Sequence, residues 1–439
     1  MIKEIAIPYG QATKIVRIPE RNLAWVEGPR YVPPVSDLAK AVRKAITYPI
    51  GTPSLKELVA EHGKKTMILV DDGTRSTPQK LILPILLDEL NTAGVKDNDI
   101  TILIGLGMHR AMSKAECIDR YGWEAMDRVT VMNLPQDPGS FVDIGTTPLG
   151  VPIHVSRLYH ESQLSIAVGN IVPHMYAGWA GGAKMVQPGV TDHVTTAQTH
   201  LMAGTRVYDI LGQVDNPVRK EMEHIALKTG LKCIVNVVLN SEEEIIAVVA
   251  GHPVEAHRAG VEIARPVYTI ELDDQPDIVI AGAKPADRDL WQGFKAINGC
   301  GMLTKDGGTL ILVTAAAEGI ALDHPQLVEL GTTPQEEVFK LLKTGKISDG
   351  VAAATYLALV QTRRRLNIIL VTEGFTNEQA TRIGLTATSS LEQTITWALD
   401  HHGDQARIGV VTKGADIMGH FRLKSSGQSK GFRQTQKRT

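Results

Sequence analysis

Short apolar runs alternate along this chain with segments in which apolar residues recur at helical spacing. Short runs rich in Val, Ile and Leu are each followed by a segment whose apolar residues have helical spacing. Such runs are typical of buried strands, and their alternation with helices indicates βαβ units and mostly parallel sheets. The expected strands are residues 67–70, 100–104, 164–168, 278–280, 310–313, 368–371 and 408–411, and the expected helices include residues 78–93, 253–264, 335–342 and 391–399.

Three segments depart from this pattern and set the expected domain limits. Residues 5–7 and 14–18 flank a glycine-containing turn, which predicts a hairpin. Residues 265–276 carry two prolines and a cluster of acids, after which the strand–helix pattern restarts. We therefore expect two α/β domains, each a mostly parallel sheet flanked by helices, at residues 1–265 and 277–414. Residues 424–439 hold five Lys or Arg and no acid, which predicts a flexible basic tail.

Composition excludes several classes of protein. The chain has 439 residues, 43% hydrophobic and 21% charged, which excludes disorder over most of its length. Its 46 Lys and Arg against 48 Asp and Glu argue against a dedicated nucleic-acid binder. No apolar run approaches the roughly 18 residues of a membrane helix, and the N-terminus does not resemble a signal peptide, so we expect no membrane partner and a cytoplasmic location. Three distant cysteines indicate neither a disulfide framework nor a cysteine metal site.

Candidate chemistry follows the first two expected strands. The strand at 67–70 leads into Asp-Asp-Gly-Thr-Arg at 71–75. Ligands bind beyond the carboxyl ends of strands in open α/β sheets, and the fork of Arg75 suits a carboxylate or phosphate. The alternative is a capped turn, with Ser76 or Thr77 as N-cap and Pro78 opening a helix. After the strand at 100–104, His109 is placed for acid–base work, unless it is only a surface histidine.

The segment after the strand at 164–168 is the richest in candidate groups. It contains His174 and a Gly-Gly-Ala-Lys run that ends at Lys184, but it does not match the phosphate-binding Gly-Lys-Ser/Thr loop. Its glycines would let backbone approach a phosphate or a planar ligand closely. Lys184 is a candidate covalent tether or phosphate contact. His200 is a candidate metal ligand only if a cofactor supplies the other donors, because metal sites usually need three or four. The alternative is a glycine-rich loop with incidental histidines.

The second half offers one further candidate face. Trp291 and Lys295 are four residues apart on an expected helix, with Gln292 beside them, and Asp287 or Asp289 would cap that helix. This face would close over a ligand held by the first half, so we expect the active site in the cleft between the two domains. The alternative is that Trp291 packs in the core and Lys295 is solvated.

Together these segments resemble the nickel-pincer lactate racemase family, from the hairpin to about residue 414. Five of them agree in order and spacing: residues 71–75, Gly-Met-His-Arg at 107–110, Pro-His-Met-Tyr-Ala-Gly with Gly-Gly-Ala-Lys at 173–184, His200, and Trp-Gln-Gly-Phe-Lys at 291–295. The resemblance implies a pyridinium-3-thioamide-5-thiocarboxylate mononucleotide that carries nickel and is attached covalently to Lys184. His200 would be the protein's nickel ligand, and cofactor-maturation proteins would be partners.

The resemblance also implies roles for the remaining residues. His109 and His174 would be the acid–base pair. Substrate would be bound by Arg75, Lys295, Gln292 and Trp291, and the cofactor would further contact Asp72, Thr74, Gly181 and Gly182. The implied reaction is inversion of C2 of a 2-hydroxy acid: one histidine takes the hydroxyl proton while hydride leaves C2, and a planar 2-keto acid rotates before hydride returns to its other face. Two bases are needed because one histidine cannot reach the hydroxyl in both orientations.

Departures from the family pattern concern the substrate. Trp291 replaces a usual Tyr, Lys284 adds a cation near the cleft together with Arg288, and residues 348–351 lack a Trp. These changes predict a larger or more polar substrate than lactate, such as malate, 2-hydroxyglutarate or an aldonate. One alternative is a nicotinamide-type dehydrogenase, but no G-x-G-x-x-G follows the first strand of either half. The other alternative is a non-enzymatic binder of hydroxy acids or nucleotides, which would not need the two histidines.

Overall fold

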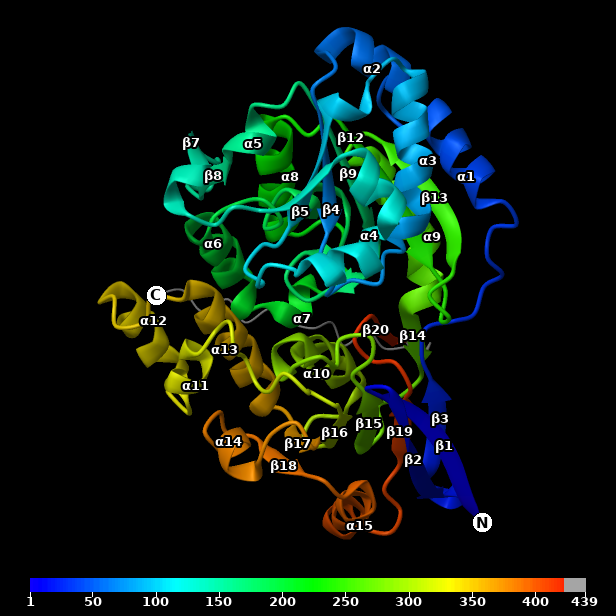
Figure 1. Cartoon of the computed structure of the whole chain (residues 1–439). Helices are drawn as coiled ribbons and strands as arrows, with labels where there is room; N and C mark the ends of the chain where they lie inside the picture. Colours follow the sequence, from blue (N-terminus) through cyan, green and yellow to red (C-terminus); the bar gives the residue numbers. More distant parts are fainter. Residues whose placement is uncertain (422–439) are drawn as a thin grey trace, which may run out of the picture.

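Two α/β bodies, one above the other in Figure 1, make up the computed structural model, which describes residues 1–421. Each body contains one six-stranded sheet with helices around it. The expected fold class is therefore confirmed. The basic tail expected at 424–439 lies outside the described residues.

The sheet of the first body has the strand order β13-β12-β9-β4-β5-β6. All neighbours are parallel except the antiparallel pair β12–β13. Every residue of β4, β9 and β12 is buried, which explains their nearly continuous aliphatic sequences. The strands are β4 (Thr66–Asp71), β5 (Ile100–Gly105), β6 (Thr130–Asn133), β9 (Leu164–Asn170), β12 (Cys233–Leu239) and β13 (Ile245–Gly251).

Nine helices and several short strands surround this sheet among the described residues. The helices are α1 (Leu38–Thr47), α2 (Leu55–His62), α3 (Gln79–Thr92), α4 (Lys114–Arg128), α5 (Arg157–His160), α6 (His193–Gly204), α7 (Val207–Ile210), α8 (Pro217–Thr229) and α9 (Glu255–Tyr268). Two short hairpins pair β7 (Phe141–Thr146) with β8 (Pro152–Ser156) and β10 (Pro173–His174) with β11 (Gly178–Trp179).

The sheet of the second body is parallel throughout, with the order β18-β17-β16-β15-β19-β3. Its strands are β3 (Leu23–Glu27), β15 (Ile278–Gly282), β16 (Thr309–Val313), β17 (Asn367–Val371), β18 (Thr386–Thr388) and β19 (Ile408–Val411). Its helices are α10 (Leu290–Leu303), α11 (Gln326–Leu330), α12 (Gln335–Lys343), α13 (Gly350–Arg363), α14 (Asn377–Thr381) and α15 (Leu391–His402).

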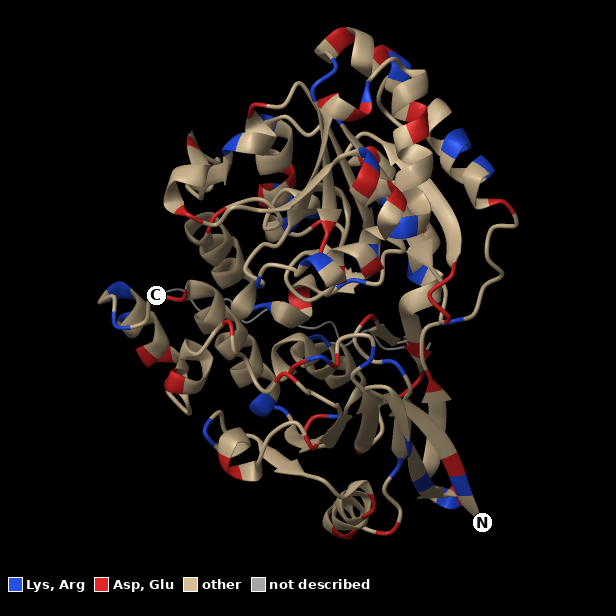
Figure 2. Cartoon of the chain, viewed as in Figure 1, with Lys and Arg blue, Asp and Glu red and all other residues tan. Residues whose placement is uncertain are grey.

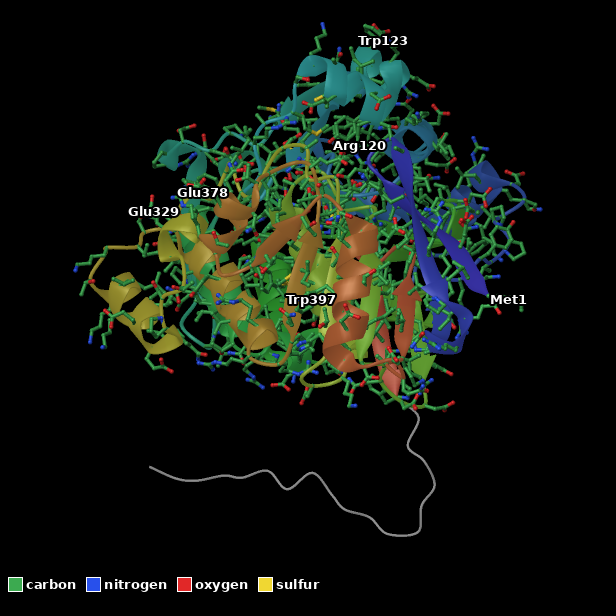
Figure 3. The ribbon with its side chains drawn as sticks, turned by 90° about the horizontal axis from the view of Figure 1, so that it is seen from below. Met1, Arg120, Trp123, Glu329, Glu378 and Trp397 are labelled. Carbon is green, nitrogen blue, oxygen red and sulfur yellow. The ribbon has the colours of Figure 1, made fainter. Side chains whose placement is uncertain are left out.

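The N-terminus corrects the expected domain limits. The hairpin of β1 (Ile2–Tyr9) and β2 (Ala12–Pro19) packs its apolar face on the second sheet, and Figure 3 shows it beside that body. β3 then pairs with β19. The first body therefore does not begin at residue 1, because the alternating apolar side chains of the hairpin are buried against strands that follow almost 270 residues later.

The expected boundary at 265–276 also has more structure than a linker. α9 continues through Pro266 to Tyr268, and β14 (Thr269–Leu272) pairs with β20 (Met418–Phe421). The pairing of β14 with β20 therefore connects the two bodies in addition to the covalent chain.

Charged residues of both signs are interspersed over the two bodies (Figure 2). Within residues 1–421, no helix combines the length and the apolar character that crossing a membrane requires.

Candidate active site

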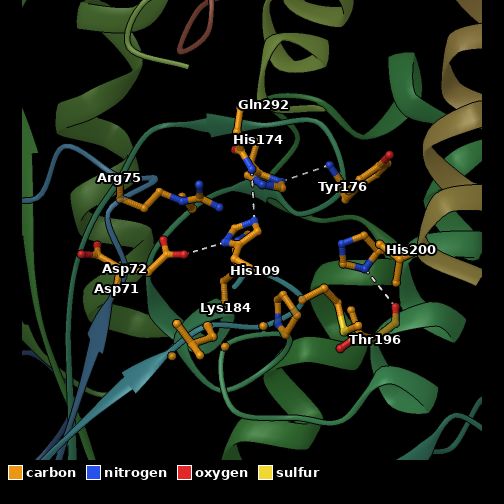
Figure 4. Close-up of a pocket in the computed structure, with 18 of the residues that line it drawn as sticks. Asp71, Asp72, Arg75, His109, His174, Tyr176, Lys184, Thr196, His200 and Gln292 are labelled. Atoms are coloured by element: carbon orange, nitrogen blue, oxygen red, sulfur yellow. Dashed lines mark hydrogen bonds and ion pairs between the residues drawn. The ribbon is translucent and has the colours of Figure 1, made fainter. Parts of the chain in front are cut away.

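A cavity between the two bodies collects most of the residues that the sequence singled out. The carboxyl ends of β4, β5 and β9 supply one side of it, and α6, α10 and α13 supply the other. This is the position at which open parallel sheets bind ligands. The predicted residues that line the cavity are Asp72, Arg75, His109, His174, Gly181, Lys184, His200, Trp291, Gln292 and Lys295 (Figure 4). Thr74 and Gly182 lie just behind its wall.

Asp71 anchors the loop that follows β4. Its buried carboxylate accepts hydrogen bonds from Arg120 Nη2 at 2.6 Å, from Gln79 Nε2 at 3.0 Å and from the Thr77 hydroxyl. α3 begins at Gln79 without a side-chain N-cap, so the capped-turn interpretation is wrong: the Thr77 hydroxyl is engaged by Asp71. The loop is therefore held rigidly in front of the strand end.

Asp72 orients His109 from the same loop. Burial works to raise the pKa of Asp72, but attraction and hydrogen bonds from His109, with further help from Arg75 and Thr74, outweigh it and hold the pKa far below its usual range. The ionised carboxylate can only accept, so His109 Nδ1–H donates to Asp72 Oδ2 at 2.7 Å. Burial, opposed by Asp72, lowers the pKa of His109, so the ring is neutral near pH 7 and Nε2 holds a lone pair.

α10 reaches across the cleft to that lone pair. Asp289 caps α10 by accepting from Gln292 N at 2.7 Å, which confirms one of the two expected caps. Lys295 Nζ donates to Gln292 Oε1 at 2.8 Å, and Gln292 Nε2 lies 3.2 Å from His109 Nε2, where its N–H donates. The second body therefore completes the hydrogen-bonded chain that begins at Asp72 (Figure 4).

His174 has the opposite arrangement of protons. The backbone N–H of Tyr176 donates to His174 Nδ1 at 3.2 Å, which leaves the proton of the neutral ring on Nε2. Burial, followed by repulsion from Lys184, Arg75 and Lys295, lowers its pKa well below the usual value. The two histidines thus differ at Nε2: that of His109 holds a lone pair, which accepts from Gln292, whereas that of His174 holds the proton.

Buried polar side chains fix the backbone around Lys184. Arg219 is 1% exposed and donates to the carbonyls of Ala177, Trp179 and Gly181, while Asn236 Oδ1 accepts from Gly182 N at 2.7 Å. A Cβ on Gly181 would lie 2.8 Å from Asn236 Oδ1, and both glycines have positive φ. These glycines are thus required by contacts within the protein, in addition to any role toward a ligand.

The amine of Lys184 is suited to a covalent bond. Burial, followed by repulsion from Arg75, Lys295 and Arg219, lowers its pKa well below the usual lysine value. An uncharged amine is nucleophilic and can form an amide-type linkage, so the position fits the tether that the family resemblance implies.

His200 has the tautomer that a metal ligand needs, with a lone pair on Nε2. On α6, capped by Asp192, its Nδ1–H donates to the carbonyl of Thr196 at 2.9 Å, and its ring lies 4.6 Å from that of Tyr176. Burial and Lys184 lower its pKa to about 3, so Nε2 keeps the lone pair that metals bind. Within residues 1–421, no cluster of three or more His, Cys, Asp or Glu is arranged to hold a metal. A nickel ion here would therefore need its other donors from a cofactor.

Arg75 and Lys295 place two cations at the same wall from different bodies. Arg75 Nη1 donates to Thr74 Oγ1 at 2.8 Å, and that hydroxyl donates to Asp72 Oδ1 at 2.6 Å. Burial and repulsion from Arg75 lower the pKa of Lys295, while Asp416 opposes this change. Two cations in a buried cleft are typical of a carboxylate site.

Trp291 lines the cavity as predicted, whereas Lys284 and Arg288 do not. Trp291 stacks on His324 with ring centroids 3.9 Å apart. Lys284 pairs with Asp287 at 3.0 Å, and Arg288 pairs with Asp289 at 2.9 Å and with Glu318 at 3.4 Å. Neither cation lines the cavity, so the expectation of an added cation beside the substrate is wrong: neighbouring carboxylates on the same loops hold both side chains.

Sequence reasoning missed several residues that build this site. They are Arg120, Tyr176, Thr196, Arg219, Asn236 and His324. Only Tyr176 lay in a segment already singled out. The others carry no local signal, because each acts through a partner that folding brings to it.

Comparison with known proteins agrees with this arrangement. The family described as Lactate racemase N-terminal domain matches residues 9–208, and the Lactate racemase C-terminal domain matches residues 272–418. The chain is 28% identical over 425 residues to a lactate racemase of Thermoanaerobacterium thermosaccharolyticum, covering 94% of this chain and 98% of the relative. It is 26% identical over 427 residues to a lactate racemase of Lactiplantibacillus plantarum, covering 94% and 99%.

Solved structures show the same fold. The lactate racemase apoprotein of Thermoanaerobacterium thermosaccharolyticum superposes with a TM-score of 0.83 at 26% identity and covers 95% of this chain and 100% of its own. A Thermotoga maritima protein at 20% identity shares the fold with a TM-score of 0.69, covering 89% of this chain and 100% of its own. Because both domain families match in order on either side of the cavity, the chain belongs to the lactate racemase family.

Proposed function

We propose that this protein is a racemase or epimerase that inverts C2 of a 2-hydroxy acid, with a nickel-pincer nucleotide bound in the cleft. One observation carries the proposal: His109 and His174 lie in one buried cavity with opposite proton arrangements, beside Arg75 and Lys295. Simple binding of a hydroxy acid needs the cations but not a second buried histidine. The relatives named lactate racemase support the same reaction class.

The cofactor would be held by Lys184 through a covalent bond and by His200 through nickel, with Asp72 and Gly181 in the surrounding wall and Thr74 and Gly182 supporting that wall. The neutral amine of Lys184 and the free Nε2 of His200 support this assignment. When bound, the group would supply a reversible hydride acceptor, which the side chains of the cavity lack. Cofactor-maturation proteins and a small 2-hydroxy acid are the partners that this function requires.

The side chains perform binding and proton transfer. Arg75 and Lys295 hold the substrate carboxylate, and Trp291 and Gln292 bound the rest of the molecule. His109 Nε2 accepts the hydroxyl proton of one enantiomer, and Asp72 stabilises the resulting imidazolium at 2.7 Å. Gln292, fixed by Lys295, shifts its hydrogen bond from His109 to the substrate oxygen.

His174 serves the other enantiomer. Burial lowers its pKa in the free protein, and repulsion from Lys184, Arg75 and Lys295 adds to this effect. A bound carboxylate offsets one unit of the charge of Arg75 and Lys295, and a covalent bond keeps the nitrogen of Lys184 uncharged. Substrate and cofactor therefore offset part of the repulsion that adds to burial in lowering the pKa of His174, and the proton that this histidine supplies to the substrate oxygen is the one on Nε2.

The test uses a 2-hydroxy acid deuterated at C2, incubated with cofactor-loaded protein in ordinary water. Hydride return keeps the deuterium in both enantiomers, whereas removal of C2–H as a proton would exchange it with solvent. Retention of the label during racemisation supports the proposal, and complete washout rejects it. Net formation of 2-keto acid with added NAD⁺, without racemisation, would favour the dehydrogenase alternative.

Substrate choice belongs to the same proposal. We retain the expectation of a larger or more polar acid than lactate, such as malate, 2-hydroxyglutarate or an aldonate. The small side chain of Val351 at the cavity wall supports this expectation, because it leaves space for a larger substrate. Lys284 and Arg288 do not support it, because both are paired with carboxylates.

A further inference from the structure

His324 is a buried histidine of the cavity that the proton-transfer steps do not use. It lies just before α11 in the second body, its side chain is 3% exposed, and it lines the cavity together with Trp291, Val351 and Thr355. No sequence motif pointed to it. Its position therefore calls for a separate account.

Asp349 fixes the protons of His324. The carboxylate caps α13 by accepting from Val351 N at 3.0 Å and Ala352 N at 2.8 Å, and His193 Nε2 lies 3.5 Å away. Burial opposes ionisation, but hydrogen bonds from His193, His324 and this backbone hold the pKa of Asp349 well below its usual value. Since the ionised group can only accept, His324 Nδ1–H donates to Asp349 Oδ2 at 2.7 Å.

The other ring nitrogen has no partner. His324 Nε2 is buried and makes no hydrogen bond, and the parallel stack on Trp291, with 15° between the planes, fixes the ring. A buried polar atom without a partner costs about 1–3 kcal/mol, and of the ten such side-chain atoms within residues 1–421 only this one belongs to a residue that lines the cavity. Of the other residues that line this part of the cavity, Thr355 accepts a hydrogen bond from the Tyr176 hydroxyl at 2.8 Å, and Val351 is apolar.

We propose that His324 Nε2 binds a hydroxyl group on C3 or beyond of the substrate, so that the enzyme acts on 2-hydroxy acids that carry a further hydroxyl. This inference rests on the proposed function and narrows its substrate class. A hydroxyl suits the site because it donates to a neutral Nε2 and accepts from a protonated one. A side-chain carboxylate would bind only the protonated ring.

The test compares glycerate with 2-hydroxybutyrate, which differ only by OH in place of CH3 at the end of the molecule. In cofactor-loaded wild-type protein we expect kcat/KM for glycerate to exceed that for 2-hydroxybutyrate at least tenfold. His324→Phe keeps an aromatic ring on Trp291 but removes the nitrogen, and should lower this ratio at least tenfold. His324→Gln, whose amide can replace Nε2, should recover part of the ratio.

Several results would overturn the inference. These are a wild-type ratio near one, a ratio unchanged in His324→Phe, or a preference for malate over glycerate. A second readout needs no turnover: glycerate should raise the Tm of the cofactor-free chain more than 2-hydroxybutyrate does, and His324→Phe should abolish the difference. If the two acids raise the Tm of the wild-type chain equally, only the role of His324 is rejected. If the cofactor-loaded protein racemises no 2-hydroxy acid, the proposed function is rejected.

Discussion

Replacing Asp72 with Asn tests how the cavity sets the proton on His109. The substitution keeps the shape of the side chain but removes its charge. Thr74 N and Thr74 Oγ1 both donate to Asp72 Oδ1, at 3.0 and 2.6 Å, so the Asn oxygen must stay at that position. Its NH2 group then faces His109 Nδ1 and donates to it. The ring proton moves to Nε2, and the lone pair that accepts the substrate proton is lost.

The size of the effect follows from the same contact. The delocalised charges of imidazolium and carboxylate are centred about 4 Å apart, where their attraction is about 4 kcal/mol at an effective dielectric constant near 20. If half of that charge has developed in the transition state, the loss is about 2 kcal/mol, and with full charge about 4 kcal/mol. These values correspond to roughly 30-fold and roughly 1000-fold in rate. The wrong tautomer adds to the loss, so we expect the upper part of this range.

The assay is kcat/KM for racemisation by loaded protein, together with ¹⁵N NMR of labelled histidines in the cofactor-free chain. Asp127→Asn, an exposed change of the same kind, is the control and should leave both readouts unchanged. In Asp72→Asn the protonated nitrogen of His109 should change from Nδ1 to Nε2. A rate within tenfold of wild type, or an unchanged tautomer, would refute this reasoning.

Four further changes test the cofactor and substrate contacts. Lys184→Ala should remove a nucleotide-sized adduct from the intact mass of protein made with the maturation system, while exposed Lys80→Ala should keep it; an adduct on Lys184→Ala would show a different tether. His200→Ala should lose nickel but keep the adduct, and unchanged nickel content in metal analysis would reject the assignment. Arg75→Ala should raise KM or lower kcat at least tenfold, since a charge-assisted bond contributes about 1.5–3 kcal/mol; wild-type kinetics would contradict the carboxylate role. Burial and Arg75 lower the pKa of Lys295, so KM should rise as pH increases through that pKa, because the ammonium loses its proton. Lys295→Arg keeps its charge over this range, and the same rise of KM in that variant would contradict the role of Lys295 in binding the carboxylate.

Local patterns predicted seven of the twelve strands of the two large sheets and much of the site. The aliphatic runs at 67–70 and 164–168 lie within β4 and β9, because a strand covered on both faces needs apolar residues at every position. Arg75 and His109 each follow the carboxyl end of a predicted strand, and because such strand ends meet at one edge of the sheet, both side chains line the cavity. The buried helix α13 was missed, since an apolar residue on every side hides the helical period.

The sequence by itself thus determined the fold class and the chemical groups that the strand ends bring to the cleft. Only the tertiary structure decided which groups are free to act. Lys284 and Arg288 are paired with carboxylates, His324 keeps an open nitrogen, and the hairpin at the N-terminus covers the second sheet rather than the first. Periodicity and spacing report the neighbours along a chain, whereas charge pairing, tautomer and burial depend on neighbours that packing brings from hundreds of residues away.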